Sequence, residues 1–577
     1  MKLFLCALLL AVVSAAAGQE ITLVKNGRSD YAIVIPPDAP PAIQHGAQEL
    51  QRFLKQMSGA ELPILTEDEA VGAGDHVIRI EQDPALGEEE LRIRTEPPRL
   101  ILSGGGKRGA LYACYALLED VLGCRWYTAR ISKIPKSRTI ALGPLDIHQK
   151  PAFEYREPYY TESLDRDWAV RNRTNGSLQH LDESVGGRVA YGKFVHTFND
   201  LVPPDVYFDK HPEYFSLING KRMKGYYQLC LTNPDVLKIV IAKVEEWIKE
   251  NPNATIFSVS QNDTYNNCQC DNCKAVEKEE GAPSGVLLRF VNAVADAIAK
   301  DHPNVLIDTL AYQWSEDPPL HARPRPNVRI RLAPIGACVS HAFDKCDANT
   351  HVYENLTAWS KITDQLYIWH YSTNFANYLQ PLPDLDEIAA DIPLFKQHGV
   401  VGLFYEGDYA PGGGGEMSEL KAYLMAKLMW DPTRPAQPII ADFLDGVYGP
   451  GAPYIQQWLD KLHAAARQQN VHAHIYDPPT APYLSPALIA EGLALFDSAE
   501  AATASDRVAH DAVQRARLAL EYVQLMQTPP SDPAYAARAK GVADKIRKYK
   551  IGQVREGEPV AQFLARIERP HPVPQGH

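Results

Sequence analysis

The sequence has little of several features that would define a protein class at once. Only nine of its 577 residues are cysteine, so disulfides would add to a core rather than replace one. It has no internal repeat of fixed period and no low-complexity segment, which argues against a solenoid or a largely disordered chain. It also lacks the run of roughly twenty apolar residues that a membrane-spanning helix needs. A globular chain of about two to four domains is therefore expected.

Positive charge is also scarce. The 58 lysine and arginine residues are outnumbered by 71 aspartate and glutamate residues, which gives a formal net charge of −13. Binding of a polyanion needs a concentrated basic surface, so we expect no nucleic-acid partner. The triple glycine at 104–106 lacks the Gly-Lys-Ser/Thr ending of a phosphate loop, and we expect no cofactor. Neutral or sparsely charged ligands fit this composition better.

The amino terminus has the organisation of a cleavable secretory signal. Lys2 supplies the positive start, residues 3–13 form an apolar run, and small residues follow at 14–17. We expect residues 1–18 to be removed and the mature protein to be secreted or periplasmic. The alternative, a membrane anchor, would need a longer apolar run, so no membrane span is expected.

The mature chain is predicted to contain three regions. Residues 19–147 indicate a small α/β domain, with a strand at 31–35 and a helix at 42–57 whose apolar residues recur at helical spacing. Residues 433–577 indicate a helical domain and tail, with helices at 436–447, 455–468, 486–502 and 506–526 and a tail from about 552. Between these regions, residues 148–432 have the pattern of a (β/α)₈ barrel.

This central region contains eight short apolar segments with room for helices between several of them. An alternation of strands and helices favours a parallel sheet, and eight units match a (β/α)₈ TIM-like barrel, giving an α/β fold class overall. The connection at 318–326 is rich in proline and leaves little space for a helix, so an open, doubly wound sheet is the alternative. The predicted strands are 153–160, 188–198, 226–231, 255–260, 305–312, 328–332, 366–371 and 400–405.

Acidic residues follow two of these predicted strands. The active site of a barrel enzyme lies at the carboxyl ends of the strands. Asp263 follows the fourth strand, and Glu406 and Asp408 follow the eighth. Because glycoside cleavage commonly uses two carboxyl groups, we predict a catalytic role for these three acids. The alternative is that each one caps a helix or binds a loop amide.

Aromatic and polar residues gather at the same strand ends. Sugars offer apolar C–H faces to aromatic rings and hydroxyl groups to polar side chains, so such residues suit a carbohydrate site; core packing is the alternative for the aromatic ones. The predicted substrate-binding residues are Asn262, Tyr160, His196, Tyr312, Trp314, Trp369, His370, Tyr371 and Arg173.

A cysteine motif, Cys-x-Cys-x-x-Cys at Cys268, Cys270 and Cys273, comes shortly after Asp263. Three sulfurs at this spacing could bind zinc with a fourth ligand such as Cys230, Cys338 or a histidine. The chain has no second Cys-x-x-Cys, so we expect instead a disulfide that stiffens this loop and assign no metal site. Cys338 and Cys346 are another possible pair.

Several of these segments resemble one family. They are Gln261-Asn262-Asp263, the cysteine motif, 285–292, 309–312, 369–371 and 428–432, and they are similar to domain-of-unknown-function family 4838. Some proteins similar to that family are classed as glycoside hydrolase family 163, endo-acting β-N-acetylglucosaminidases on N-glycans. The segment before the barrel also resembles the amino-terminal domain of family 67 α-glucuronidases and family 20 hexosaminidases.

The resemblance implies a glycoside hydrolase that acts on N-acetylhexosamine-containing glycans and is retaining with acetamide assistance. Glu406 would be the general acid/base and Asp263 the acetamide-orienting carboxylate, or the reverse. The family pattern Phe-Glu-x-Gly would place an acid at Tyr405, so either Glu406 is that acid or a catalytic group has been lost or moved.

Two alternatives remain at this stage. An α-glucuronidase would need a cation facing the substrate carboxylate, for which Arg156, Arg171 and Arg173 are candidates. A catalytically silent glycan-binding protein would follow if Tyr405 replaces the acid. A glycan is the expected partner in each case, and no oligomeric state is predicted.

Overall fold

The computed structural model describes residues 20–71 and 74–569, so the predicted secretory signal lies outside the described residues. The chain forms two compact units. The first comprises the residues up to Cys124 with Ile134–Lys150 and Glu183–Gly186, and the second comprises Arg125–Lys133, Pro151–Asp182 and everything from Gly187 on. Within the described ranges, no helix is both long and apolar enough to cross a membrane.

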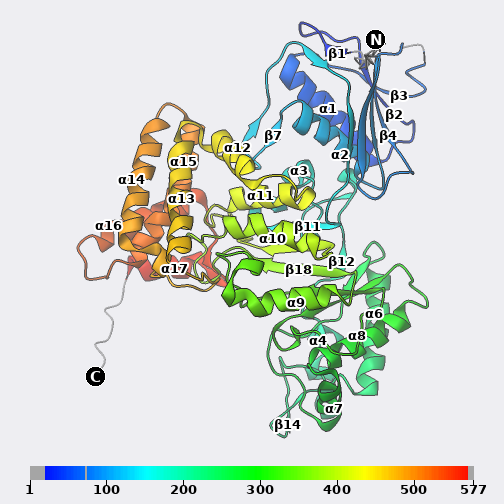
Figure 1. The fold of residues 1–577 in the computed structure, drawn as a ribbon, viewed down its shortest axis with the longest axis vertical. Coiled ribbons are helices and arrows are strands. Elements are labelled where there is room, and N and C mark those ends of the chain that lie inside the picture. The colour runs from blue at the N-terminus through cyan, green and yellow to red at the C-terminus, as the bar shows by residue number, and fades with distance from the viewer. Residues whose placement is uncertain (1–19, 72–73, 570–577) are drawn as a thin grey trace, which may run out of the picture. The chain divides into compact units, whose positions relative to one another are not determined.

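The first unit is a six-stranded mixed sheet packed against two helices (Figure 1). Helix α1 (Pro41–Ser58) buries the predicted apolar stripe from Ile43 to Met57 and ends at Gly59 in the left-handed conformation. This confirms the helix predicted at 42–57. The sheet has the order β10 (Asp146–Gln149), β5 (Leu91–Glu96), β6 (Arg99–Gly104), β4 (Val77–Gln82), β2 (Ala32–Ile35) and β3 (Ile64–Thr66), with α2 at Gly109–Ala116 and a separate pair formed by β1 (Ile21–Val24) and β9 (Ile140–Leu142).

The second unit is built on a parallel sheet of seven strands that curls into a half-barrel. Its order is β11 (Tyr155–Tyr159), β19 (Gly402–Glu406), β18 (Leu366–Tyr371), β17 (Val328–Leu332), β16 (Leu306–Ala311), β15 (Ile256–Ser258) and β12 (Tyr191–Lys193). Because every pair is parallel, all the carboxyl ends lie at one edge of the sheet.

The closed eight-stranded barrel predicted from the sequence is not formed by the described residues. Segment 226–231 is an irregular loop rather than a strand, and β11 and β12 are the two unpaired edges. The apolar signal of this segment comes from Leu229 and Leu231, which are buried against other loops. Its polar residue Gln228 holds the backbone oxygens of Asn262 and Thr264, so the segment supports a neighbouring loop instead of joining the sheet.

Helices connect most of these strands, as a parallel sheet requires. No α-helix lies between β16 and β17, where a short 3₁₀ turn (Gln313–Ser315) precedes the proline-rich stretch. This confirms the prediction that the connection leaves too little space for a full helix. The helices of this layer are α6 (Pro234–Glu250), α7 (Asp271–Glu280), α8 (Ser284–Ile298), α9 (Thr350–Ser360), α10 (Leu385–Gln397) and α11 (Ser418–Trp430), with short helices α3 (Arg166–Arg171), α4 (Phe198–Leu201) and α5 (Pro204–Tyr207) and the small strand pairs β7 (Arg125–Trp126) with β8 (Ser132–Lys133) and β13 (Leu217–Ile218) with β14 (Lys221–Arg222).

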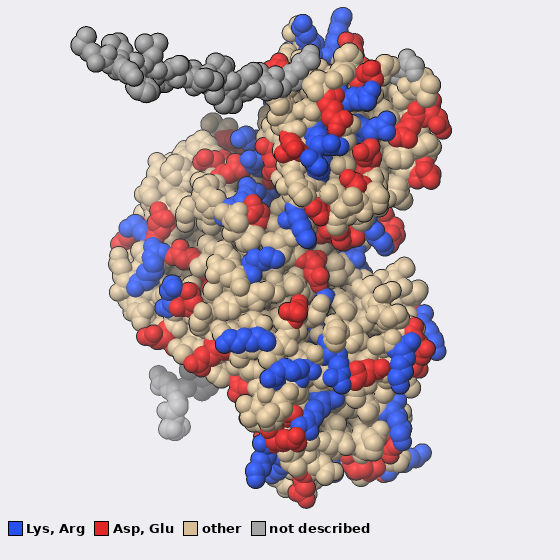
Figure 2. Space-filling view, turned by 45° about the vertical axis from the view of Figure 1, so that its right-hand side comes forward, with Lys and Arg blue, Asp and Glu red and all other residues tan. Residues whose placement is uncertain are grey.

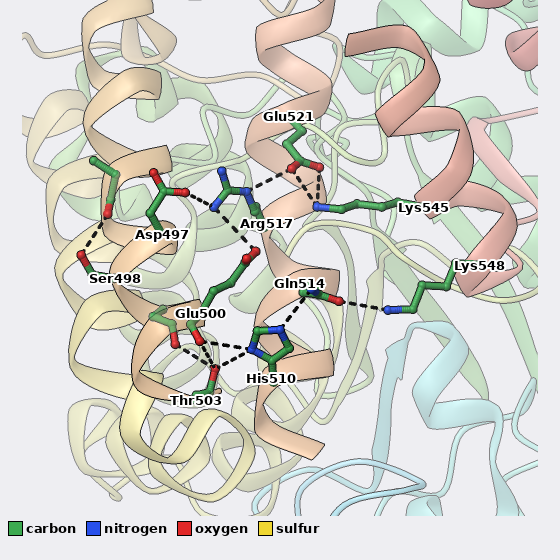
Figure 3. A network of polar contacts seen from close by, with 12 residues as sticks. Asp497, Ser498, Glu500, Thr503, His510, Gln514, Arg517, Glu521, Lys545 and Lys548 are labelled. Atoms are coloured by element: carbon green, nitrogen blue, oxygen red, sulfur yellow. Dashed lines mark hydrogen bonds and ion pairs between the residues drawn. The ribbon is translucent and has the colours of Figure 1, made fainter. Parts of the chain in front are cut away.

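The carboxy-terminal part of the second unit is helical. Ion pairs join its helices: Arg517 lies 2.6 Å from Asp497 and 3.0 Å from Glu521, which in turn lies 2.7 Å from Lys545 (Figure 3). The predicted helices correspond to α12 (Ala436–Tyr448), α13 (Ala452–Gln468), α14 (Pro486–Ala502) and α15 (Arg507–Met526). The predicted tail is instead a hairpin of β20 (Gln553–Arg555) and β21 (Glu558–Pro559) followed by α17 (Val560–Glu568), after a further helix α16 (Tyr535–Tyr549).

Charge is distributed without strong segregation on the face that Figure 2 shows. Lysine and arginine side chains lie among aspartate and glutamate side chains over both the upper and the lower part of this face. A phosphate-binding surface would require basic residues gathered in one area. The described residues on this face form no concentrated basic area of the kind that binds a polyanion.

A buried ion-pair cluster joins helix α11 to the residue before helix α10 and to the loop before α11. The Lys421 ammonium is 3.0 Å from Asp384 and 3.0 Å from Glu416, and all three side chains are at most 4% exposed. Removing the cation leaves two acids buried beside each other, so we expect K421M to lower the free energy of unfolding by about 3–5 kcal/mol. Urea denaturation measures this change.

The exposed pair of Lys238 and Asp235 supplies the control, since its N–O distance is 2.9 Å but its side chains are 75% and 55% exposed. K238M should change the free energy of unfolding by less than about 1 kcal/mol. Equal, small effects of both substitutions would contradict the account of the buried cluster.

Candidate active site

The alternation of side chains along strand β18 divides its residues between two faces. Trp369 and Tyr371 point toward the inside of the half-barrel, where the Trp369 ring contacts Phe404 at 4.7 Å between centroids. His370 points outward and binds Glu387 of helix α10, with 2.8 Å between Nε2 and Oε1. The inner face of β18 therefore offers an indole and a phenol at the carboxyl end of the sheet.

Strand β19 is in register with β18, and its residues divide in the same way. Tyr405 pairs with His370 and lies on the outer face with its ring 5.2 Å from the imidazole, whereas Glu406 pairs with Tyr371 on the inner face. An acid at position 405 would face the helices. The shift relative to the family pattern thus leaves a carboxyl group at Glu406 on the inner face.

Glu406 is set in an environment that favours its protonated form. Burial raises the pKa of Glu406 to about 8, and the charges of Glu556 and Asp263 act in the same direction. A hydrogen bond of 2.9 Å from Trp369 Nε1 to Glu406 Oε2 partly opposes them and fixes the orientation of the carboxyl group. At neutral pH this side chain can therefore donate a proton.

Asp263 lies in the loop that follows β15 and is held by two neighbouring donors. The Tyr312 hydroxyl donates to Asp263 Oδ1 at 2.9 Å, and Gln313 Nε2 donates to the same oxygen at 3.0 Å. Gln313 has a φ of +52°, in the left-handed region that non-glycine residues rarely adopt. The turn after β16 is thus held in an unusual conformation that directs two donors at one carboxylate oxygen.

His196 follows β12 and also has a left-handed backbone, with a φ of +54°. Its Nδ1 lies 2.8 Å from the carbonyl oxygen of Gln261, which can only accept, so Nδ1 carries the proton. Burial lowers the pKa of His196, which keeps the imidazole neutral at pH 7. The Nε2 atom is left as a hydrogen-bond acceptor.

These groups line one cavity of about 260 Å³ at the carboxyl ends of the strands. Six of the residues predicted from the sequence are among those that line it: His196, Asp263, Tyr312, Trp369, Tyr371 and Glu406. The sequence analysis missed the other lining residues, which are Leu310, Ala333, Ile335, Phe375, Tyr476 and Glu556.

Tyr476 and Glu556 reach the cavity from the carboxy-terminal helical part. The backbone of Phe375, in the loop after β18, binds both segments: its N–H donates to Ile475 O at 2.8 Å, and its carbonyl accepts from Glu556 N at 2.9 Å. Neither residue belongs to a motif or follows a predicted strand. Only the tertiary packing of the helical part onto the half-barrel brings them to the site.

Four of the predicted site residues instead support the walls of the site. Asp408 accepts hydrogen bonds from the backbone N–H groups of Ala410 (3.0 Å) and Gly415 (2.7 Å). It therefore binds loop amides, which was the alternative to a catalytic role. Buried Asn262 donates to Tyr227 O at 2.6 Å. His370 is on the outer face, as described above. The Tyr160 ring packs directly on Gly407, and a Cβ added at position 407 would lie 2.3 Å from the ring.

Trp314 and Arg173 also lie outside the cavity. Trp314 lines a separate, small pocket with Cys268 and Cys273. Arg173 is buried with its guanidinium carbon 4.9 Å from the centre of the Trp430 ring, and Arg156 lies over the same ring at 5.3 Å. These arginines therefore pack against the carboxyl end of helix α11 and are not among the residues that line the cavity.

A second cavity of about 420 Å³ is larger but chemically less suited to catalysis. Its acids are already paired: Glu416 lies 3.0 Å from Lys421, and Glu419 lies 3.4 Å from Arg515. Paired carboxylates are poor proton donors, so we place the candidate site at the strand ends.

The disulfides expected from the sequence are not formed. All eight cysteines in the described part of the chain are free thiols. The sulfurs of Cys230 and Cys270 are 3.6 Å apart, well beyond the S–S bond length of about 2.05 Å. The motif cysteines lie close together in another arrangement, in which their sulfurs and that of Cys230 are within 4.8 Å of one another.

The residues that build this half-barrel also identify the family. Residues 126–460 match the family described as Domain of unknown function (DUF4838). The chain belongs to this family. The DUF4838 match spans all seven strands of the half-barrel and extends into α13. It stops before Tyr476 and Glu556, the two cavity residues from the carboxy-terminal part. No curated protein matches the chain.

Solved structures of glycoside hydrolases are similar in fold. A family GH115 4-O-methyl-α-glucuronidase with specificity for decorated arabinogalactans has a TM-score of 0.59 at 13% identity, over 92% of this chain and 77% of that one. A β-N-acetylhexosaminidase from Bacteroides fragilis NCTC 9343 has a TM-score of 0.41 at 14% identity, over 73% and 91%. At 13% identity the likeness to the first of these structures is one of fold alone, and function has to be argued from the site.

Proposed function

We propose that this protein is a glycoside hydrolase that acts on N-acetylhexosamine-containing glycans, with retention of configuration and participation of the substrate's acetamide. The proposal depends on one observation above all: Glu406, with a pKa raised by burial to about 8, lines the same cavity as Asp263. A proton donor and a second carboxylate around one sugar-sized space are the groups that glycoside cleavage needs.

The reaction assigns one role to each acid. Glu406 protonates the glycosidic oxygen while the acetamide oxygen of the substrate attacks the anomeric carbon, which breaks the glycosidic bond and forms a cyclic oxazolinium ion. Asp263 accepts the acetamide N–H and balances the developing positive charge. Water then adds to the anomeric carbon and gives its proton to Glu406, which restores the acetamide and the protonated acid.

An apolar wall of the cavity supports the binding of an N-acetyl group. Leu310, Ala333 and Ile335 give the cavity an apolar side beside Tyr312 and Asp263. An acetamide has a methyl group that suits such a wall and an N–H that needs an acceptor. Because Asp263 Oδ1 already receives two donors, its other oxygen would take the acetamide N–H.

The charge of the cavity favours a neutral sugar over a uronate. Three acids line it, Asp263, Glu406 and Glu556, and no lysine or arginine is among the described lining residues. A uronate carboxylate would need a guanidinium or ammonium partner, and the arginines considered for that role lie elsewhere. This leaves the α-glucuronidase alternative with less support, although the most similar fold quoted above belongs to such an enzyme.

A substrate panel tests the proposal. Chromogenic β-N-acetylglucosaminides and β-N-acetylgalactosaminides, fluorescent chitooligosaccharides and N-glycans are compared with 4-O-methyl-α-glucuronides, with released sugar quantified and the anomer of the first product determined by NMR. We expect release from an N-acetylhexosaminide with retained configuration. Release of glucuronic acid alone would contradict the proposal, and binding of glycans without any release would favour the silent glycan-binding alternative.

Tyr312 is expected to act through Asp263. Y312F removes the 2.9 Å hydrogen bond to the carboxylate but keeps the ring in the cavity wall. Hydrogen bonds to charged groups contribute about 1.5–3 kcal/mol, so kcat/KM should fall about 10- to 100-fold. Steady-state kinetics measures the loss, which should be found mainly in kcat because Asp263 stabilises charge in the transition state. An unchanged kcat with a raised KM would assign Tyr312 to ground-state binding instead.

A further inference from the structure

The motif cysteines form a compact cluster with one cysteine from an earlier loop. The sulfurs of Cys230, Cys268, Cys270 and Cys273 all lie within 4.8 Å of one another. Cys230 Sγ is 3.6 Å from Cys270 Sγ and 4.0 Å from Cys273 Sγ. Four thiolates bound tetrahedrally at the Zn–S distance of about 2.3 Å would be about 3.8 Å apart. These distances therefore match a Zn(Cys)₄ site and exclude disulfides.

The groups around these sulfurs are hydrogen-bond donors, as bound thiolates require. The backbone N–H of Leu217 donates to Cys268 Sγ at 3.4 Å, and Arg222 Nη1 lies 3.8 Å from the same sulfur. The Thr232 hydroxyl lies 3.2 Å from Cys273 Sγ. A guanidinium beside the cluster offsets part of the negative charge that four thiolates and one Zn²⁺ would carry.

A second cluster has two sulfurs and two imidazoles. Cys338 Sγ is 3.4 Å from His341 Nδ1, Cys346 Sγ is 3.3 Å from His472 Nδ1, and all four donor atoms lie within 4.8 Å of one another. Tetrahedral Zn²⁺ with bonds of about 2.3 Å to sulfur and about 2.0–2.1 Å to nitrogen places sulfur and nitrogen about 3.6 Å apart. Both cysteines are buried, and both imidazoles are half-buried.

We propose that each cluster binds one Zn²⁺ ion through its four protein ligands, as a closed structural site. A ligand set of four thiolates, or of two thiolates and two imidazoles, is typical of structural zinc. Hard cations such as Mg²⁺ and Ca²⁺ prefer oxygen ligands, which neither cluster contains. The proposal rests on these ligand geometries and not on the proposed glycosidase activity.

Each site lies next to a loop that carries a cavity residue. The cysteine motif starts five positions after Asp263, and the same loop is tied down by Gln228 at Thr264 O (2.7 Å). His472 lies four positions before Tyr476. The segment between them is bound to the loop that carries Cys338, because the backbone N–H of Val339 donates to Ala473 O at 2.9 Å. The zinc ions would thus fix two walls of the cavity, one at Asp263 and one at Tyr476.

Metal analysis of the purified full-length chain tests the proposal. Mass-spectrometric quantification should find two zinc ions per chain after growth with zinc and removal of loosely bound metal. C230S should retain one zinc ion, H472A should retain one, and C114S, which changes a buried cysteine outside both clusters, should retain two. A variant that keeps two zinc ions would overturn the site that it was meant to remove.

Three further measurements keep the test decisive if a variant fails to fold. Titration of the wild-type chain with an organomercurial and a zinc indicator should release two equivalents of zinc, and cobalt substitution should give distinct thiolate-to-cobalt absorption for the two ligand sets. Peptide mapping without reduction should find the eight cysteines of the described residues unlinked. Less than half an equivalent of zinc, iron in its place, or disulfides among the cluster cysteines would overturn the proposal.

Discussion

Replacement of Glu406 by glutamine is expected to lower kcat on N-acetylhexosaminides by about 10²- to 10⁴-fold, the contribution of a positioned general acid/base. Glutamine has the same shape, and its amide oxygen can still accept the hydrogen bond that Trp369 donates to Glu406 at 2.9 Å. The loss should therefore come from the missing proton and not from altered packing. Initial rates on the substrate released fastest in the panel measure it.

Asp408 supplies the matched control, because it is the other acid at the end of β19. Its carboxylate binds the amides of Ala410 and Gly415, so D408N should lower the melting temperature but leave kcat per folded molecule within about threefold. If D408N lost as much activity as E406Q, or if E406Q kept full activity, the assignment of the general acid would be wrong.

The raised pKa of Glu406 also predicts how E406Q changes stability with pH. The folded-state pKa is about 8 because of burial, whereas an exposed glutamate titrates near about 4.3. Between these values the folded state keeps a proton that the unfolded state releases, so the contribution of Glu406 to stability is present below pH about 4 and is lost as the pH rises to about 8. The melting temperature of E406Q should therefore rise relative to wild type from pH 5 to about 8. A difference that is constant across this range would contradict the raised pKa.

Replacement of Asp263 by asparagine is expected to lower kcat by about 10²- to 10³-fold with a small change in KM. The carboxylate balances a charge that develops only in the transition state, and groups aimed at such charge contribute about 3–4 kcal/mol. Asparagine can still accept from Tyr312 and Gln313, so the loop geometry is preserved. Steady-state kinetics on an N-acetylhexosaminide provides the measurement.

Glu556 is the comparison for this prediction, since it is the third acid that lines the cavity and has no assigned role. E556Q should reduce kcat less than tenfold. A larger loss in E556Q than in D263N would move the second catalytic role to the carboxy-terminal hairpin and would leave Asp263 as a structural residue.

Local patterns were sufficient to predict helix α1, the seven strands of the half-barrel, helices α12 to α15 and half of the residues that line the cavity. The stripe from Ile43 to Met57 and the apolar segments at β15 to β19 carry their periodicity within a few residues. Polar residues just beyond parallel strands meet at one edge for topological reasons, which is why Asp263 and Glu406 line the same cavity. These inferences need no knowledge of distant contacts.

The errors have a common physical origin in tertiary packing. The segment at 226–231 is apolar because Leu229 and Leu231 are buried in a loop, and periodicity alone cannot separate that case from a buried strand. Asp408 follows a strand as Glu406 does, but backbone amides occupy its oxygens. Tyr476 and Glu556 were missed because the packing of remote segments brings them to the cavity.

The cysteine motif shows the same limit. Cys268, Cys270 and Cys273 form a group by spacing alone, but spacing left the fourth ligand open among Cys230, Cys338 and a histidine, and only the fold of the loop at 226–231 brings Cys230 to the motif. The second cluster joins Cys338 and Cys346 to His472, whose partners lie more than a hundred positions earlier. Sequence spacing alone could not distinguish paired cysteines from metal ligands.

The central claim is that the cavity at the strand ends holds an N-acetylhexosaminide between Glu406 and Asp263. A crystal structure of E406Q with a β-linked N-acetylglucosamine disaccharide tests it most directly. We predict that the glycosidic oxygen lies within about 3.2 Å of the side chain at position 406 and that the acetamide N–H donates to Asp263. A disaccharide bound elsewhere, or bound in this cavity with its glycosidic oxygen remote from position 406, would contradict the account.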